Sequence, residues 1–299
     1  MNNRGAVEPA RRFAWPGKNN MQAHKEMRVA FAEDGYLICD HFASAKECAE
    51  MIVQADNLIA AFDETAEQIV FSASGQSHAA SSYFMNSASQ ISCFLEAGAV
   101  DEAGRLIKPK TQAINKIGHA LHDLDPVFSH FSRQDKCADM ARLLGLNTPL
   151  LLQSMVICKQ PFIGGEVNSH QDSTFLYTEP ESTIGFWFAL EDANKTNGCL
   201  QVASGGHKGP LRKLFKKVDG KMKMIDLNND PFPETDTFVE VKKGSLVLLH
   251  GRLPHYSCEN TSLKSRHAYT VHVIDKNNEY PEWNWLQRSS LPLKSFIND

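Results

Sequence analysis

Apolar residues in the first half of the chain recur at the three- and four-residue spacing of amphipathic helices. We expect helices over residues 27–33, 44–62, 113–121 and 127–144. Ser44 and Glu47 have the spacing of a capping box, in which each side chain accepts a hydrogen bond from the other residue's backbone N–H. Residues 71–90 are rich in Ser, Ala and Gly, which predicts a mobile loop of the kind that often contacts substrates.

The pattern changes at Leu150, where short apolar runs begin to alternate with turn residues. These runs, which predict strands, cover residues 150–157, 183–190, 199–203, 244–250 and 267–274. Repeated short strands at this spacing are typical of a β-sandwich or barrel. Helices in the first half and strands in the second therefore predict an α+β fold, with helices packed on a β-barrel core.

The composition is that of an ordinary globular protein, with 299 residues, 42% of them hydrophobic, and a formal net charge of −4. Because there is no basic excess, we expect no nucleic-acid partner. No apolar run approaches the roughly 18 residues needed to span a bilayer, so we expect no membrane span. We expect a flexible tail over residues 1–22 and a single domain over residues 23–299. The Lys-rich block 208–223 is expected to be a solvated loop.

Seven cysteines are scattered along the chain without a CxxC pair, which indicates a reducing, cytoplasmic environment rather than a disulfide framework or a zinc ribbon. The first 20 residues lack the apolar segment of a secretory signal. Their single acidic residue, Glu8, leaves an organellar transit segment as the alternative. A metal site in this chain must then be built from histidines and carboxylates.

His170 and Asp172 have the most informative spacing in the chain. In an extended segment alternate residues face the same side, so both side chains can point at one ion. An imidazole nitrogen and a carboxylate oxygen suit first-row metals, and one remote histidine would complete a 2-His-1-carboxylate facial triad with open coordination positions. The HxD pair by itself is a weak signal, because the chain holds 12 histidines.

The third ligand is expected at the end of the apolar run 244–250 or shortly after it. Either His250 or His255 fits this position. We favour His255, because Ser257 shares its face two residues later, whereas His250 ends an apolar run and can simply complete core packing.

Arg266, at the start of the next predicted strand, indicates which co-substrate binds. 2-Oxoglutarate can chelate iron through its 1-carboxylate and 2-keto oxygens, which leaves its far carboxylate buried and charged. A buried charge needs a partner, and a guanidinium pairs with a carboxylate through two hydrogen bonds. The hydroxyl of Ser257 can satisfy a remaining lone pair of that carboxylate.

Several long stretches of the chain resemble the phytanoyl-CoA dioxygenase (PhyH) family. The resemblance covers roughly residues 25 to 290 and lies in the stretches FAEDGYLICDHF (31–42), INKIGHALHDLDPVF (114–128), QSMVICKQPFIGGEVNSHQDSTFLYTEP (153–180), GFWFALEDANKTNGCL (185–200), LVLLHGRLPHYS (246–257) and SRHAYTVHV (265–273). It implies a double-stranded β-helix, a cupin-like jelly roll, flanked by N-terminal helices. This implied fold agrees with the α+β pattern of helices and strands.

The resemblance implies a non-haem iron oxidoreductase, a dioxygenase that uses Fe(II), O₂ and 2-oxoglutarate as co-substrate, with ascorbate as a reductant. Carried over residue by residue, it assigns metal binding and catalysis to His170, Asp172 and His255. The family's 2-oxoglutarate contacts correspond to Lys116, Met155, Trp187, Ser257 and Arg266 in addition to the metal ligands. Halide-transferring relatives replace the carboxylate with a small residue, so Asp172 argues against halogenation.

The chain departs from the family pattern at Gln201 and over residues 203–207, where the family commonly has a large apolar residue and a Pro-Gly-Ser-His run. These positions lie near the mouth of the barrel in the family, so we expect the departures to alter the substrate rather than the iron chemistry. The expected reaction is oxidation of a C–H bond of a small organic substrate by hydroxylation, desaturation or oxidative cyclisation. A small molecule of secondary metabolism and an acyl-CoA of the phytanoyl type are the two substrate hypotheses.

Two other classes of protein compete with this interpretation. A zinc-dependent cupin-like hydrolase or isomerase could use the same three metal ligands, but it would have no need for Ser257 with Arg266. A non-catalytic jelly-roll binding module would have no reason to keep the three ligands together.

Overall fold

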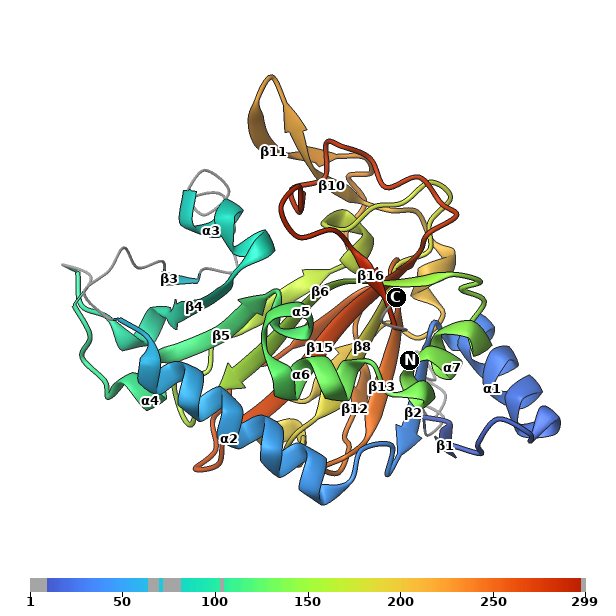
Figure 1. Cartoon of the computed structure of the whole chain (residues 1–299), viewed down its shortest axis with the longest axis horizontal. Coiled ribbons are helices and arrows are strands. Elements are labelled where there is room, and N and C mark those ends of the chain that lie inside the picture. Colours follow the sequence, from blue (N-terminus) through green and yellow to red (C-terminus); the bar gives the residue numbers. More distant parts are fainter. Residues whose placement is uncertain (1–9, 64–69, 72–81, 103–104, 297–299) are drawn as a thin grey trace, which may run out of the picture.

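The computed structural model describes residues 10–63, 70–71, 82–102 and 105–296, and two sheets form its centre (Figure 1). The larger sheet has the strand order β1-β2-β13-β8-β15-β6-β5-β4-β3, with β16 paired to β6, and the smaller has the order β12-β9-β14-β7. The strands β6, β7, β8 and β9 alternate between the larger and the smaller sheet, and so do β12, β13, β14 and β15. The two series meet in the smaller sheet, where β9 pairs with β12. This alternation makes the double-stranded β-helix, so the expected jelly roll is confirmed.

The strands are β1 (Arg12–Ala14), β2 (Tyr36–Asp40), β3 (Val70–Phe71), β4 (Ile91–Glu96), β5 (Ile114–His119), β6 (Pro149–Lys159), β7 (Val167–His170), β8 (Ile184–Ala189), β9 (Leu200–Val202), β10 (Lys213–Val218), β11 (Lys221–Asp226), β12 (Thr237–Val239), β13 (Leu246–His250), β14 (His255–Ser257), β15 (Arg266–Asp275) and β16 (Lys294–Ser295). The α-helices are α1 (Met21–Asp34), α2 (Ala45–Ala61), α3 (Ser82–Asn86), α4 (Lys110–Ala113), α5 (Leu121–Leu124), α6 (Pro126–Ser132) and α7 (Asp135–Leu143).

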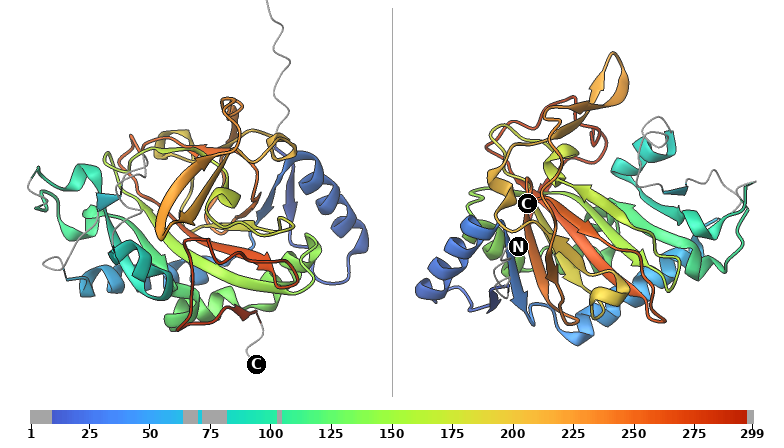
Figure 2. Two further views of the ribbon diagram at one scale, coloured as in Figure 1. Left: turned by 90° about the horizontal axis from the view of Figure 1, so that it is seen from above. Right: turned by 180° about the vertical axis from the view of Figure 1, so that it is seen from behind.

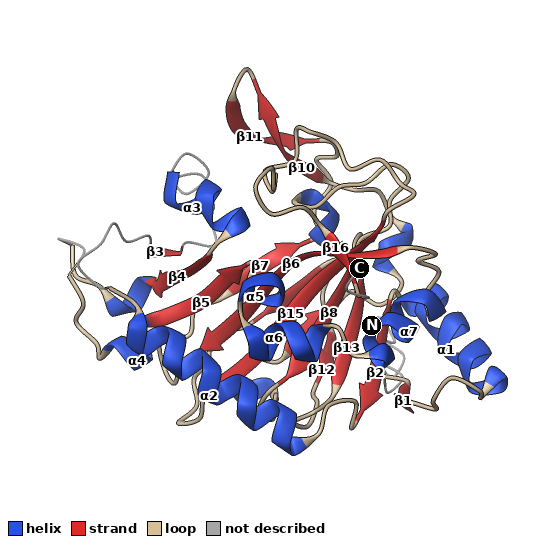
Figure 3. Cartoon of the chain, in the orientation of Figure 1, coloured by secondary structure: helices blue, strands red, loops and turns tan. Residues whose placement is uncertain are grey.

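Helices cover one face of the larger sheet, as the view coloured by secondary structure shows for α2, α5 and α6 (Figure 3). Strand β8 shows how the sequence places these layers, because its side chains alternate between the two faces. Phe186 and Phe188 belong to the core beneath the helices, whereas Trp187 belongs to the core between the two sheets. Every residue of β8 is buried, so both faces of this strand are covered. The barrel interior is thus lined by strands that are themselves fixed on both sides.

Helix α2 begins where the capping box predicts. The Ser44 hydroxyl accepts from the backbone N–H of Glu47, and the Glu47 carboxylate accepts from the backbone N–H of Ser44. The expected helix over 113–121 is wrong, because residues 114–119 form β5, which pairs with both β4 and β6. The β-branched Ile114 and Ile117 suit a strand, and cross-strand pairing on both edges outweighs the local helical periodicity.

The helix expected over 127–144 is two helices, α6 and α7, which are separated by Arg133 and Gln134. The loop expected over 71–90 lies partly outside the described residues, and within the described part residues 82–86 form α3. The Lys-rich block 208–223 is not a plain loop, because most of it forms the antiparallel hairpin of β10 and β11. Figure 1 shows this hairpin projecting beyond the strands of the larger sheet, and the view from above places it over the middle of the molecule (Figure 2).

Residues 1–9 of the expected tail lie outside the described residues, whereas β1, also inside the range 1–22, pairs in parallel with β2. The division into a tail and one domain stays a prediction. All seven cysteines are free thiols, and six of them are buried. No helix in the described part of the chain has the length and apolarity that crossing a membrane requires.

Candidate metal centre and its pocket

A pocket of about 890 Å³ opens between the two sheets. Its walls come from the inward faces of β5, β6, β8 and β15 on one side and of β7 and β14 on the other. The hairpin of β10 and β11 and the segment around Trp285 also line it. All three candidate metal ligands and all five expected 2-oxoglutarate contacts line this one pocket.

His170, Asp172 and His255 meet in this pocket, and their ligand atoms all lie within 4.8 Å of one another. The Nε2 atoms of His170 and His255 lie 3.8 and 3.7 Å from the same oxygen, Oδ1 of Asp172. Pairing of β14 with β7 brings the two histidines together, since His255 lies opposite His170 in the register. The strand pairing of the smaller sheet therefore assembles the cluster from two distant parts of the sequence.

The hydrogen bonds of the two histidines fix which ring nitrogen is free. Nδ1 of His170 lies 2.8 Å from the carbonyl oxygen of Asn168, and Nδ1 of His255 lies 3.0 Å from that of Leu253. A carbonyl only accepts, so each Nδ1 carries the hydrogen and each Nε2 presents its lone pair. Two lone pairs and a carboxylate oxygen then face one another, an arrangement that a bound cation stabilises.

The ionisation of these groups also suits a cation. Desolvation in the pocket, followed by the nearby His255, lowers the pKa of His170 to about 4, so its imidazole is neutral at neutral pH. Burial alone would raise the pKa of Asp172, but the imidazoles around it, His272 foremost, lower it below its usual value. The cluster therefore offers a neutral imidazole nitrogen from His170, Nε2 of His255 and one carboxylate oxygen.

Arg266 is buried in the same pocket, with a relative exposure of 2%. Its Nη2 donates to the hydroxyl of Ser257 at 3.4 Å, and its guanidinium lies over the ring of Trp187 at 5.3 Å. Its Nε and Nη1 have no hydrogen-bond partner among the described residues. Burial lowers the pKa of Arg266 to about 10, so it stays charged at neutral pH. A buried cation whose Nε and Nη1 have no partner among the described residues is suited to an anion that enters the pocket.

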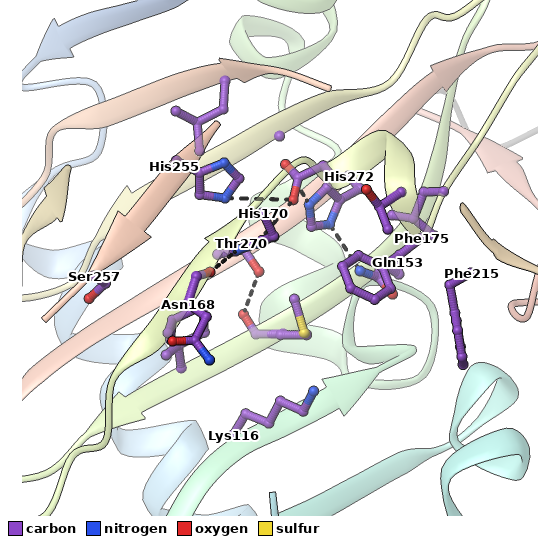
Figure 4. Close-up of a pocket in the computed structure, with 18 of the residues that line it drawn as sticks. Lys116, Gln153, Asn168, His170, Phe175, Phe215, His255, Ser257, Thr270 and His272 are labelled. Atoms are coloured by element: carbon purple, nitrogen blue, oxygen red, sulfur yellow. Dashed lines mark hydrogen bonds and ion pairs between the residues drawn. The ribbon is translucent and has the colours of Figure 1, made fainter. Parts of the chain in front are cut away.

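Lys116 and Met155 lie on the neighbouring strands β5 and β6, and both line the pocket. Figure 4 shows Lys116 across the pocket from His255. The Lys116 ammonium lies over the ring of Phe94 at 5.1 Å, and burial lowers the pKa of Lys116 to about 7. His250, the alternative third ligand, does not line the pocket, because its ring packs against His207 and Phe31.

Two polar residues behind the cluster, His272 and Gln153, were not predicted from the sequence. Nε2 of His272 lies 3.2 Å from Oδ2 of Asp172, and Nδ1 of His272 lies 3.1 Å from Nε2 of Gln153. A signal for His272 was available, since Arg266 and His272 are six residues apart on one strand and therefore share a face. Gln153 offered no such signal, because only the register of β15 against β6 places it opposite His272.

The outer part of the pocket was also not predicted. Its walls are apolar and aromatic, and Phe175 and Phe215 lie on the side away from Ser257 (Figure 4). Phe215 comes from the hairpin of β10 and β11, whose turn residues Asp219 and Gly220 both have positive φ angles. An Asp-Gly pair between two strands is a strong hairpin signal, and the many lysines around it obscured that signal.

The positions that depart from the family pattern do not line the pocket, contrary to expectation. Gln201 instead donates to the sulfur of Cys258, and His207 packs on His250. Neither Gln201 nor any residue of 203–207 is among the described residues that line the pocket. The expectation that these positions alter the substrate site is therefore not supported by their place in the fold.

Comparisons with known proteins agree with this geometry. The model of the family described as phytanoyl-CoA dioxygenase (PhyH) matches residues 31–268. A protein of Oryza sativa subsp. japonica named phytanoyl-CoA dioxygenase 1 is 44% identical over 274 residues, which are 90% of this chain and 95% of that protein. A protein of Bos taurus named phytanoyl-CoA dioxygenase domain-containing protein 1 is 40% identical, over 86% of this chain and 92% of that protein.

Solved structures share the fold at low sequence identity. The epimerase SnoN in complex with Fe³⁺, alpha ketoglutarate and nogalamycin RO superposes with a TM-score of 0.62 at 16% identity, covering 87% of each chain. EctD from S. alaskensis with 2-oxoglutarate and 5-hydroxyectoine gives a TM-score of 0.58 at 19% identity, over 89% of this chain and 81% of that one.

Proposed function

The chain belongs to the phytanoyl-CoA dioxygenase family, and from this premise we propose that it is a mononuclear Fe(II)- and 2-oxoglutarate-dependent dioxygenase that oxidises a C–H bond of a small organic substrate. The other products are succinate and CO₂. One observation carries the proposal: the same pocket holds a cluster of three metal-ligand side chains and a buried arginine with unused N–H groups.

Fe(II) fits the donor set of the cluster. Two imidazole nitrogens and one carboxylate suit first-row divalent metals, and three protein ligands leave positions open for other molecules. Zinc would fit these donors as well, so the donors alone do not select an oxygenase. Iron would be held by His170, Asp172 and His255.

Arg266 makes the distinction, because its charge fits 2-oxoglutarate and has no role in a zinc hydrolase. Its Nη1 and Nη2 could donate together to one carboxylate, and the Ser257 hydroxyl lies beside its Nη2. Trp187 and Met155 add apolar walls to the space between Arg266 and the metal cluster. The far carboxylate of a dicarboxylic keto acid would therefore be paired while its other end faces the metal.

When bound, iron and 2-oxoglutarate supply the oxidising chemistry, which uses O₂ and releases succinate and CO₂. The protein's own residues hold and orient the reactants. His170, Asp172 and His255 would hold the metal, and three protein ligands would leave coordination positions for the co-substrate and O₂. The apolar walls exclude water from the site, which favours oxidation of the substrate over side reactions.

The outer part of the pocket forms a chamber, and this chamber is the proposed place of the substrate. Aromatic and thioether side chains dominate its walls: Phe84, Phe175, Phe215, Met222, Met224 and Trp285. This chamber favours a substrate with a sizeable apolar part near the reacting C–H bond. Hydroxylation, desaturation and cyclisation are all compatible with such a chamber.

An acyl-CoA 2-hydroxylase of the phytanoyl type is the second candidate, and one observation favours it. Lys213 and Lys223 of the hairpin line the pocket and keep about half of their side chains exposed, 46% and 48%. Cations at a pocket rim attract phosphate groups of the kind that coenzyme A carries. The names of the relatives point to the same substrate class.

The test is succinate formation by the purified protein, prepared without oxygen and loaded with Fe(II). We expect 2-oxoglutarate-dependent succinate release that needs both Fe(II) and O₂ and increases with a true substrate. A panel should pair straight and branched acyl-CoA thioesters with the corresponding free acids. Activity with Zn(II) in place of Fe(II), or hydrolysis without 2-oxoglutarate, would contradict the proposal.

A further inference from the structure

We propose that His272 is a positioning residue that holds one oxygen of Asp172, so that only the other oxygen is available to the metal. This inference rests on the proposed function. Nε2 of His272 lies 3.2 Å from Oδ2 of Asp172, whereas the two candidate ligand histidines face Oδ1. The two carboxylate oxygens thus have different neighbours, and the side of the metal is the side of Oδ1.

The contact requires a particular tautomer of His272. At 3.2 Å from a carboxylate oxygen, Nε2 must carry a hydrogen, because two acceptors at this distance would repel each other. In the tautomer with its hydrogen on Nε2, Nδ1 is an acceptor. This tautomer is the reverse of the one in His170 and His255, whose Nδ1 atoms donate to backbone carbonyls.

Gln153 supplies the donor that this tautomer needs. Its Nε2 lies 3.1 Å from Nδ1 of His272, and the two residues are direct partners across β6 and β15. An amide N–H that donates to Nδ1 leaves the ring hydrogen on Nε2, where it faces Asp172. The two contacts of His272, with Gln153 and with Asp172, are therefore consistent in their donors and acceptors.

Gly185 closes the remaining side of the same carboxylate oxygen. A Cβ atom at this position would lie 2.8 Å from Oδ2 of Asp172, closer than such contacts allow. The backbone of β8 therefore approaches Oδ2 as closely as only glycine permits. Oδ2 thus has His272 on one side and the backbone of Gly185 on another, and both neighbours restrict the orientation of the carboxylate.

His267 provides a matched control on the same strand. It is also a histidine next to a carboxylate, since its Nδ1 lies 2.8 Å from Oε2 of Glu191. It does not line the pocket. A change at His267 therefore disturbs β15 and a histidine–carboxylate pair without touching the metal cluster.

The experiment measures binding of Co(II), and of Fe(II) without oxygen, to the full-length wild-type protein and to His272→Leu, His272→Gln and His267→Gln. Loss of a residue that orients a metal ligand typically costs about 10–100-fold in metal affinity. We expect a loss of this size for His272→Leu. His272→Gln should restore most of the affinity, because its amide can still donate to Oδ2, and His267→Gln should bind metal like the wild type.

Unchanged metal affinity in His272→Leu would overturn the inference while leaving the proposed function intact. A wild-type protein that binds neither metal would instead overturn the proposed function. A second measurement does not depend on any variant: nitrogen NMR of the zinc-loaded wild-type protein. We expect the ring hydrogen of His272 on Nε2, and a hydrogen on Nδ1 alone would contradict the inference.

Discussion

The inner and outer parts of the pocket are built in different ways. The inner part consists mainly of polar side chains on strands, with Asp172 in the short turn after β7. Strand pairing fixes the positions of four of them: His170 opposite His255, and Gln153 opposite His272. The outer part consists of apolar side chains from a hairpin and from irregular segments, such as Phe215. Under the proposed function, the barrel would position the metal and co-substrate, whereas the hairpin and the irregular segments around it would contact the substrate.

Removing the carboxylate of the inner part should have the largest effect. Asp172→Ala leaves two histidines without the anionic ligand, and we expect Fe(II)-dependent turnover of 2-oxoglutarate to fall below detection. Succinate release and anaerobic Fe(II) binding check this, with circular dichroism as the control for folding. Retained succinate production would show that the cluster is not the metal centre.

Arg266→Leu should separate metal binding from co-substrate binding. Loss of one partner of a buried ion pair costs about 3–5 kcal/mol, which predicts ~10²–10³-fold weaker binding of 2-oxoglutarate. Fe(II) affinity should stay near that of the wild type, because Arg266 does not belong to the metal cluster. Calorimetric titration with 2-oxoglutarate measures the effect, and unchanged affinity would remove Arg266 from the co-substrate site.

A change in the outer part should alter only the substrate step. Phe215→Ala removes a large apolar wall, and we expect KM for the organic substrate to rise about tenfold, the effect of a few buried methylene groups. The dissociation constant of 2-oxoglutarate should not change. Phe238→Ala, at a phenylalanine on β12 that is 39% exposed and outside the pocket, is the control. Weaker 2-oxoglutarate binding by Phe215→Ala would break the division into two parts.

The pH dependence distinguishes the buried lysines of the pocket from Arg266. Burial lowers the pKa of Lys116 and that of Lys159 to about 7 but that of Arg266 only to about 10, so near neutral pH the two lysines change their charge and Arg266 does not. As the pH rises through about 7, the Lys116 ammonium loses its proton and its attraction for an anion disappears. We therefore expect 2-oxoglutarate binding to weaken by up to ~10-fold from about pH 6 to about pH 8.5. Lys116→Met should bind with a shallower slope, because Lys159 still loses its proton in this range, and an identical slope would exclude Lys116 as a source.

The lysines at the rim should have the smallest effect. Exposed charges contribute about 0–1 kcal/mol each and are screened by salt. Lys213→Ala with Lys223→Ala should raise KM for an acyl-CoA a few-fold at low salt and leave KM for an uncharged substrate unchanged. If acyl-CoA and uncharged substrates respond alike, the rim does not recognise phosphate.

The difference between the inner and the outer part of the pocket also explains what could be predicted from the sequence. The spacing of His170, Asp172, Ser257 and Arg266 carries chemistry that composition alone does not, and the structure brings all four into one pocket. Strands β6, β8, β9, β13 and β15 also follow from short apolar runs between turn residues, whereas β7, β12 and β14 do not. The barrel and the expected ligands of the inner part were therefore within reach of sequence reasoning, but Gln153 and His272 were missed.

The rest depended on long-range pairing. Strand β5 has local helical periodicity and becomes a strand only because β4 and β6 flank it. Gln153 is one glutamine among many until the register of β6 and β15 places it opposite His272. The hairpin of β10 and β11 was hidden by its lysines, although Asp219 and Gly220 mark its turn.

A crystal structure of the protein with Fe(II) and 2-oxoglutarate, prepared without oxygen, tests the central claim most directly. We predict iron bound by His170, Asp172 and His255, with the far carboxylate of 2-oxoglutarate on the guanidinium of Arg266. A structure in which the co-substrate binds elsewhere, or in which Arg266 does not contact it, would contradict the account.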